Sequence, residues 1–417
     1  MEKPKIRFKG YQEDWEQRKV TELGEIYIGL VTTMTEHYTD NGHLLIRNSD
    51  IKDGYFEFGE NPIYLDEEFS EQNKSRMHQL GDVITVHTGD IGTSAVIGEN
   101  EVNSIGFATI VTRPNQEILD SNYFATYLNT DTHKQWAVSM ATGDGRSNYN
   151  LKDYTKLVVP IPEIEEQKKI AACIVNLNSL ITLHQRKCEE MKILKKYMLQ
   201  KMFPQNGQLV PQIRFSGFTE DWEQRKVTEL LKNSSSAMKI GPFGSALKKE
   251  YFVEEGIKVY AQENAFTGDF SMGDYFITED KYKELKSCEL YPGDLVISMM
   301  GTIGACAIFP KNAEKGIMNS HLLRLQFNNE VIPEYIMYLL RDSVLIRKQI
   351  DRLSVGSIMS GLSSSVVKKL VFPIPKLAEQ KRIVEYLDSI DRLITLHQQK
   401  CDELRNIKKF MLQNMFI

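Results

Sequence analysis

The sequence predicts an α+β protein in which two mixed, strand-rich modules are separated by two long helices that pair as an antiparallel coiled coil. Three observations lead to this fold class: a duplicated frame, an apolar heptad stripe in each half, and strand patterns that run into glycine loops. We expect a first module at residues 1–162, a central spacer helix at 163–203, a second module at 204–375 and a C-terminal spacer helix at 376–417. The tandem duplication predicts a pseudo-twofold relation between the halves.

The flanks of the two halves match almost letter for letter. The matching pairs are Ile6-Arg7-Phe8 with Ile213-Arg214-Phe215, Asp14-Trp15-Glu16 with Asp221-Trp222-Glu223, Glu166-Gln167-Lys168 with Glu379-Gln380-Lys381, and Ile181-Thr182-Leu183-His184 with Ile394-Thr395-Leu396-His397. A solenoid would repeat every 20 to 50 residues or so and keep its signature throughout. Here the middles agree only in outline, so one frame carries two different inserts.

Each half contains a helix with a coiled-coil stripe, because apolar positions step alternately by four and three. The predicted seam consists of Ile170, Ile174, Leu177, Ile181 and His184 in the first helix, and of Ile383, Leu387, Ile390, Ile394 and His397 in the second. Pro162 and Pro375 stand where a helix can start but not continue. One such helix alone would leave its stripe in water, so we expect the two to pair within the chain.

The modules are predicted to be rich in short strands. Gly81-Asp82 and Gly293-Asp294 each precede an apolar strand that reaches a glycine loop, at Gly89 and at Gly301. Short helices are expected at residues 123–128 and 335–340.

Composition is that of an ordinary globular protein, with 41% hydrophobic and 26% charged residues in 417. The chain has no run of about 18 apolar residues and its N-terminus is charged and polar, so we expect neither a membrane span nor a secretion signal, and a cytoplasmic location. The five cysteines form no C-x-x-C pair, which predicts reduced thiols. With a net charge of −5, any nucleic-acid surface has to be a local patch.

Several of these features together resemble the specificity subunit of Type I restriction-modification systems. They are the Ile-Arg-Phe to Trp-Glu opening, the Gly-Asp strand, the Gly241-Pro242-Phe243-Gly244-Ser245 stretch, and the Pro-Ile-Pro that leads through Glu-Gln-Lys into a heptad helix. The order of these motifs, seen twice, carries the resemblance over nearly the whole chain.

The resemblance implies that each module is a target recognition domain that binds one half of a split site in double-stranded DNA. The helices would set the spacing of the half-sites and dock the partner subunits. Two modification subunits would methylate DNA with S-adenosylmethionine, and two restriction subunits would use ATP and Mg²⁺. The chain itself would bind no cofactor and would not be an enzyme.

DNA contacts require cationic and amide side chains on loops, because phosphates need donors and base edges need bidentate or amide pairing. Residues of these types at expected loop or strand ends are Arg47, Asn48, Thr88, Arg146, Ser147, Asn148, Gln262, Asn264, Thr302, Asn319 and His321. Each residue type fits a solvated turn equally well. We therefore predict the set as the DNA interface rather than any single contact.

Motifs of catalysis and metal binding are incomplete. Asn61-Pro62-Ile63-Tyr64 departs by one residue from the Asn-Pro-Pro-Tyr of amino-methyltransferases, which favours a turn, and no Gly-x-x-x-x-Gly-Lys-Ser/Thr loop exists. Glu166-Gln167-Lys168 and its repeat open predicted helices, which favours helix capping and surface charge over a nuclease site. His184 with Cys188, and the matching pair in the second helix, place the thiols too far apart for one zinc ion in an antiparallel pair. We predict no catalytic and no metal-binding residue.

Basic residues gather toward the distal ends of both helices, among them Lys192, Lys195, Lys196, Lys201, Arg405, Lys408 and Lys409. Solvated helix ends are the expectation, with contacts to partner subunits or DNA backbone as the alternative. Two other functions remain open at this point: a duplicated scaffold that binds proteins, and a fused restriction or modification enzyme with an unrecognised active site.

Overall fold

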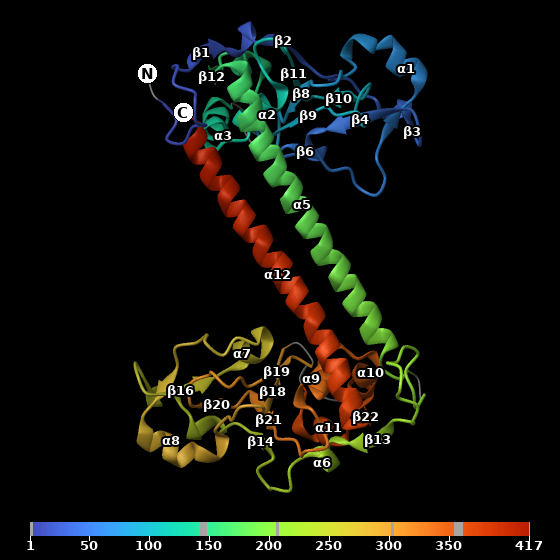
Figure 1. Cartoon of the computed structure of the whole chain (residues 1–417), viewed down its shortest axis with the longest axis vertical. Helices are drawn as coiled ribbons and strands as arrows, with labels where there is room; N and C mark the ends of the chain where they lie inside the picture. The colour runs from blue at the N-terminus through green and yellow to red at the C-terminus, as the bar shows by residue number, and fades with distance from the viewer. Residues whose placement is uncertain (1–2, 142–147, 206–207, 302–303, 354–361, 417) are drawn as a thin grey trace. The chain divides into compact units, whose positions relative to one another are not determined.

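The computed structural model describes residues 3–141, 148–205, 208–301, 304–353 and 362–416 (Figure 1). The chain divides into two compact units, unit 1 from Met1–Arg186 with His397–Ile417 and unit 2 from Lys187–Leu396. Both long helices, α5 (Ile164–Lys201) and α12 (Leu377–Met415), contribute a part to each unit. Over the described residues, no helix combines the length and the apolarity needed to cross a bilayer.

Unit 1 is built on two four-stranded sheets and two ladders of paired strands. The first sheet, antiparallel throughout, has the order β2 (Gly24–Ile28), β11 (Ile110–Pro114), β8 (Val83–Thr85), β9 (Ser94–Val96). The second has the order β10 (Ile105–Phe107), β4 (His43–Arg47), β7 (Tyr64–Leu65), β3 (Tyr38–Thr39). The ladders pair β1 (Glu16–Lys19) with β12 (Val158–Ile161) and β5 (Ile51–Lys52) with β6 (Tyr55–Phe56). The β1–β12 ladder closes the module where α5 begins.

Four short helices complete the first module: α1 (Glu67–Gln72), α2 (Ser121–Leu128), α3 (Asp131–Met140) and α4 (Leu151–Tyr154). Side-chain oxygens of Asp66, Asp120 and Thr130 cap the first three by accepting backbone N–H groups of the first turn. Single turns of 3-10 helix lie at η1 (Val20–Glu22), η2 (Thr35–His37), η3 (Asn48–Asp50) and η4 (Lys74–Arg76). The helix α2 packs its buried face on β8 and β9, and this contact forms the core.

Unit 2 repeats this plan. Its first sheet has the order β14 (Met238–Ile240), β21 (Leu322–Leu325), β18 (Leu295–Ser298), β19 (Cys306–Ile308). Its second sheet has the order β15 (Phe252–Val253), β17 (Phe276–Ile277), β16 (Ile257–Tyr260), β20 (Gly316–Met318). A ladder pairs β13 (Glu223–Lys226) with β22 (Val371–Ile374). Its helices are α6 (Val227–Leu230), α7 (Gln262–Thr267), α8 (Glu279–Leu285), α9 (Pro333–Asp342), α10 (Val344–Leu353) and α11 (Ser364–Lys369), with 3-10 turns η5 (Gly244–Ala246), η6 (Lys249–Tyr251) and η7 (Lys286–Cys288). The helix α7 follows β16 where the hairpin β5–β6 follows β4 in unit 1. The expected short helices are confirmed as α2 and α9.

A buried ion pair joins each module to the first turn of a long helix. Arg7 donates from Nε and Nη2 to the two carboxylate oxygens of Glu166, at 2.7 and 2.8 Å. Arg214 holds Glu379 with the same two distances. The side chains of Glu166 and Glu379 are 0% and 2% exposed, so each carboxylate depends on its arginine for charge compensation.

The neighbouring glutamines tie the same junction together. The Gln167 amide accepts the Asp120 N–H and donates to the carbonyl oxygens of Ile118 and Pro162. Gln380 makes the corresponding three bonds in unit 2. The prediction of capping and surface charge for Glu166 and Gln167 was therefore wrong, because the module folds back over the first helical turn and buries both side chains.

The far end of the other long helix enters each module's core. In unit 1, the Phe416 ring lies 6.3 Å from Trp15 and 5.5 Å from Tyr123 between ring centroids. In unit 2, Phe203 lies 6.4 Å from Trp222 and 5.8 Å from Tyr335. The Ile6 N–H donates to the Asn414 carbonyl at 2.9 Å, and accordingly the two ends of the chain lie close together in Figure 1.

The two long helices pair with opposite chain directions in both units. In unit 1, Nδ1 of His184 lies 2.9 Å from Nδ1 of His397, and the Cys401 thiol donates to the Ile181 carbonyl. In unit 2, the Cys188 thiol donates to the Ile394 carbonyl. The predicted seam residues Ile170, Ile174, Ile181, Ile383, Leu387 and Ile390 are buried, and Leu177, His184, Ile394 and His397 are half-buried. Each thiol thus faces a backbone carbonyl of the opposite helix.

Two histidines of unit 1 are buried as neutral groups. Burial lowers the pKa of His78 to about 4, with smaller opposing effects of Asp82 and Arg113. Burial also lowers the pKa of His133 to about 4, although its bond with the Leu128 carbonyl raises it and Lys134 lowers it further. The sequence of unit 2 contains a single histidine, His321.

Breaking one partner of the junction ion pair should destabilise the protein strongly. Arg7→Met leaves the Glu166 carboxylate buried without its counter-charge, and we expect the free energy of unfolding to fall by about 3–5 kcal/mol. The double variant Arg7→Met/Glu166→Met should recover much of this loss. Urea denaturation measures both, with Arg18→Met, which breaks an exposed pair, as a control that should cost less than about 1 kcal/mol. Equal effects of Arg7→Met and Arg18→Met would contradict the assignment.

Mild acid should loosen unit 1 before unit 2. Because the folded pKa of His78 and His133 lies below their unfolded value near 6.5, the unfolded state binds more protons between these values. Stability is therefore complete above about pH 6.5 and is lost as pH falls toward 4, by up to roughly 3 kcal/mol per histidine. Hydrogen exchange, corrected for its intrinsic pH dependence, should show protection lost first in unit 1. Simultaneous loss in both units would refute the prediction.

Candidate functional site

Four strand ends of the first sheet in unit 1 meet at one edge. Ile110 at the start of β11 pairs with Ile28 at the end of β2 and with Thr85 at the end of β8, and Thr85 pairs with Ser94 at the start of β9. The loops at residues 86–93 and 108–109 leave the sheet at this edge. It is the place where several of the predicted interface residues come together.

Asn48 braces two of these loops. Its side-chain oxygen accepts the His87 N–H at 2.7 Å, and its amide donates to the carbonyl oxygens of Phe107 and Ala108 at 3.3 Å. Ala108 has a φ of +50°, which is an uncommon value for a residue with a side chain. The Asn48 amide therefore holds a strained turn in place. Because its nitrogen and its oxygen are both engaged in internal hydrogen bonds, it has little remaining capacity to bond an external partner.

Thr88 and Asn148 form the second contact of this edge. The Thr88 hydroxyl lies 2.7 Å from the Asn148 side-chain oxygen and 2.8 Å from Nδ1 of His87. Partial burial lowers the pKa of His87, while a hydrogen bond with Asn150 raises it. Arg146 and Ser147 lie outside the described residues.

The Arg47 guanidinium is bound within its own turn by Asp50. It donates to both carboxylate oxygens of Asp50, at 3.0 and 2.9 Å, which raises the pKa of Arg47. Its side chain remains 39% exposed. A contact of Arg47 with phosphate would have to share the guanidinium with Asp50.

The corresponding edge of unit 2 has the same topology. Leu323 pairs with Ile240 at the end of β14 and with Ile297 in β18, and Ile297 pairs with Cys306 at the start of β19. The exposed His321 donates its backbone N–H to the Asn319 side-chain oxygen, and its carbonyl accepts the Met299 N–H. Asn319 and His321 thus lie beside the end of β18.

The remaining predicted residues of unit 2 have different environments. Asn264 is 1% exposed, accepts the Ala261 N–H and donates to the carbonyl oxygens of Asp269 and Met272. Asn264 therefore stabilises its own loop from the inside, whereas the sequence predicts it as an outward-facing residue of the DNA interface. Gln262 is half-buried at the start of α7, and Thr302 lies outside the described residues.

Exposed apolar side chains accompany both edges, and the sequence reasoning missed them. Phe243 is 72% exposed and Met300 44%, while in unit 1 Val31 is 68% and Phe107 40% exposed. The one available signal was an aromatic residue between turn-forming residues in Gly241-Pro242-Phe243-Gly244. Such side chains offer van der Waals contact to a partner that covers the edge.

One glycine is required at the same point in both units. A Cβ on Gly29 would overlap the Gly106 carbonyl oxygen, and a Cβ on Gly241 would overlap that of Asn319. The chain at each glycine therefore approaches a neighbouring backbone segment, β10 in unit 1 and the residue after β20 in unit 2, more closely than a side chain would permit. This role is common to the two copies, although the residues that follow each glycine differ.

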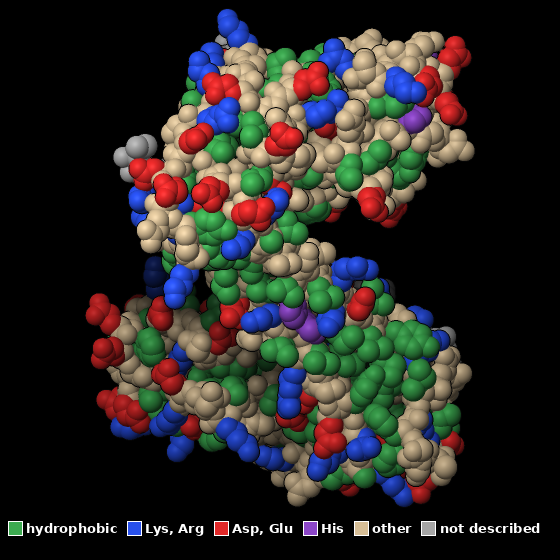
Figure 2. Space-filling view, turned by 45° about the horizontal axis from the view of Figure 1, so that its top comes forward, with side chains coloured by type: hydrophobic (Ala, Val, Ile, Leu, Met, Phe, Trp, Pro, Cys, Tyr) green, Lys and Arg blue, Asp and Glu red, His purple; other side chains and the backbone are tan. Residues whose placement is uncertain are grey.

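Charge is mixed over the face of the molecule that Figure 2 shows. In Figure 2, Lys and Arg side chains alternate with Asp and Glu over the visible face. Among the residues that the structure places, no three or more His, Cys, Asp or Glu side chains are grouped as ligands of a metal ion.

Comparison with known proteins identifies relatives over most of the chain. The model of the Type I restriction modification DNA specificity domain matches residues 12–192 and 219–406. The MjaVIII specificity subunit of a Type I restriction enzyme from Methanocaldococcus jannaschii is 24% identical over 345 residues, covering 81% of this chain and 78% of the relative. The EcoKI specificity subunit of Escherichia coli K12 is 21% identical over 327 residues, covering 73% and 68%.

Solved structures share the fold. The crystal structure of the S subunit of a Type I restriction-modification system from M. genitalium aligns with a TM-score of 0.63 at 15% identity, covering 100% of this chain and 99% of that one. Because the family model matches most of the chain in two copies, this protein belongs to the family of Type I restriction modification DNA specificity domains.

Proposed function

We propose that this chain is the specificity subunit of a Type I restriction-modification complex, and that each module recognises one half of a bipartite DNA site. The observation that carries the proposal is one sheet edge built twice on a constant frame, with different loops in each copy. A conserved frame with two different edges is what recognition of two different half-sites requires. The helices then set the distance between the half-sites.

The loop edges supply the chemistry for base recognition. Histidine, threonine and amide groups both donate and accept hydrogen bonds, as the edges of base pairs in the major groove require. At these edges we propose His321 and the Thr88–Asn148 pair for base contacts. From the sequence alone we add Arg146, Ser147 and Thr302, which lie outside the described residues. Asn48 and Asn264 act as braces that fix loop geometry.

In this proposal the chain is not an enzyme and binds no cofactor of its own. Two modification subunits, with S-adenosylmethionine, methylate the site, and two restriction subunits, with ATP and Mg²⁺, cleave DNA in the cytoplasm. The net charge of −5 supports this division, because phosphate neutralisation then falls largely to partner subunits.

Exposed leucines on the long helices support docking of the modification subunits there. Leu180 and Leu183 are 44% and 45% exposed, and their counterparts Leu393 and Leu396 are 43% and 57% exposed. Since these side chains lie outside the helix seam, each helix offers the same apolar contact to one copy of a partner.

Two other functions compete with this proposal. A protein-binding scaffold would bind its partner without the steep salt dependence of phosphate contacts, so titration of binding against salt separates the two. A fused enzyme would need an active site in the chain, and would methylate or cleave DNA without partner subunits.

Deletion and module exchange test the proposed function. With the modification subunit co-expressed, single-molecule sequencing of the genome should show methylated adenines at a split motif that disappears when this chain is deleted. Replacing residues 1–162 by the first module of a relative should change one half of the motif only, because unit 2 keeps its own loops. A continuous motif, or one that survives deletion, would refute the proposal.

Single variants should separate contact from brace in unit 2. His321→Ala removes an exposed side chain while its backbone bonds remain, so methylation should fall about 10- to 100-fold with unchanged thermal stability. Asn264→Ala leaves the buried Ala261 N–H without its acceptor, and should lower the free energy of unfolding by about 1–3 kcal/mol. Methylation kinetics and thermal melts measure the two effects. The opposite pattern would reverse the assignments.

A further inference from the structure

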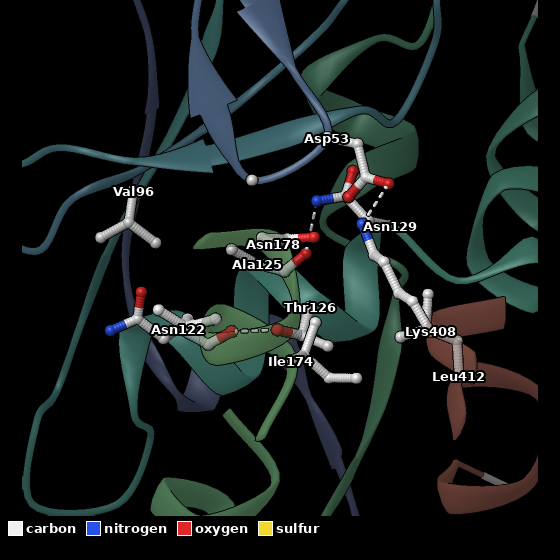
Figure 3. Close-up of a pocket in the computed structure, with 12 residues that line it drawn as sticks. Asp53, Val96, Asn122, Ala125, Thr126, Asn129, Ile174, Asn178, Lys408 and Leu412 are labelled. Carbon is white, nitrogen blue, oxygen red and sulfur yellow. Dashed lines mark hydrogen bonds and ion pairs between the residues drawn. The ribbon is translucent and has the colours of Figure 1, made fainter. Parts of the chain in front are cut away.

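The turn of the hairpin β5–β6 is bonded to α12 and lies against α5 within unit 1. Lys408 of α12 donates to the Asp53 carboxylate at 2.8 Å, and its side chain is only 13% exposed. Gly54, with a φ of +84°, lies so near Asn178 of α5 that a Cβ there would be 3.1 Å from the Asn178 amide nitrogen. Figure 3 shows Lys408 reaching Asp53 beside Asn178, around a cavity of about 20 Å³ that has room for one water.

The same turn connects directly to the candidate DNA interface. The Gly54 N–H donates to the Ser94 carbonyl at 3.0 Å, and Ser94 is the first residue of β9, which ends the 86–93 loop. On its other side the hairpin follows η3, which begins with the brace Asn48. If the turn were displaced on the helices, it would therefore move both Ser94, which ends one loop of the interface, and Asn48, which braces the loops.

Unit 2 uses the matching lysine differently. The repeat of Ile181-Thr182-Leu183-His184 as Ile394-Thr395-Leu396-His397 makes Lys195 the counterpart of Lys408, and Asp391 that of Asn178. Lys195 pairs with Asp391 at 2.6 Å, helix to helix, and the Tyr338 hydroxyl of α9 donates to Asp388 and Asp391. The acid that neutralises this lysine is thus Asp53 of the module in unit 1 and Asp391 of the facing helix in unit 2. The expectation of solvated helix ends is wrong for both lysines, since their side chains are 13% and 15% exposed.

We propose that Lys408, Asp53 and Asn178 are positioning residues that fix how the first recognition domain is seated on the helix pair. They thereby restrict the spacer length that the complex accepts between its half-sites. This inference rests on the proposed function. It assigns to a half-buried lysine of the C-terminal helix a part in specificity, although that lysine is not among the residues proposed for base contacts.

The test uses the full chain in complex with its modification subunits. Methylation rates are measured on duplexes that carry the motif with its native spacer and with a spacer one base pair longer or shorter. The variants are Asp53→Asn, Lys408→Met and the exchange Asp53→Lys/Lys408→Asp. The control is Lys400→Met, which removes a lysine of the same helix that pairs within the helix with Glu403 at 2.8 Å. Melting curves and co-elution with the modification subunit establish that each variant is folded and assembled.

The wild type and Lys400→Met should prefer the native spacer strongly. In Asp53→Asn and Lys408→Met, the ratio of the methylation rate on the native spacer to that on an altered spacer should fall about tenfold. Their discrimination against base changes in the second half-site should stay unchanged. The charge exchange should restore most of the spacer preference. Unchanged spacer preference in both single variants would overturn the proposal. A uniform fall in rate on all duplexes would also overturn it, since it would indicate a merely structural role. If the wild type shows no split motif, the proposed function itself fails, independently of these variants.

Discussion

The buried Arg–Glu pair at the start of each long helix is the constraint on which both units depend. A carboxylate with 0–2% exposure is stable only beside its counter-charge, so the segment that carries Arg7 or Arg214 must return to the helix start. The same segment bonds through its backbone to the far end of the other helix, at Asn414 or Lys201. The ion pair therefore fixes the module, one helix start and one helix end at a single point.

This junction frees the sheet edges to vary. Strand order, the aromatic contact of Phe416 or Phe203 and the glutamine bonds are the same in the two units, whereas the loops at the edges differ. Gly29 and Gly241 mark the limit of this freedom, because the close approach of strand end and loop excludes any side chain there. The sequences of the two copies diverge immediately after these glycines.

The duplicated helices also show how identical residues acquire different partners. Lys408 and Lys195 stand at equivalent positions, yet one holds a hairpin of the module and the other an aspartate of the facing helix. The difference follows from the inserts, since unit 1 has the hairpin β5–β6 where unit 2 has α7. A largely desolvated lysine needs an acid within reach, and the hairpin supplies it in unit 1 whereas the facing helix supplies it in unit 2.

The sequence by itself determined the duplication, the two helices with their seam, and the strand–glycine-loop order, because these depend on periodicity and local propensity. It also predicted Asn319 and His321 at loop or strand ends, and they lie between β20 and β21. Only the tertiary structure decided that Glu166 and Gln167 are buried, that Asn264 faces inward and that Arg47 is held by Asp50. The direction of a polar side chain depends on which donor or acceptor the fold brings within about 3 Å. For Glu166 and Gln167 these partners come from distant segments, whereas Arg47 and Asn264 bond within their own turns, whose conformation the residue types alone do not determine.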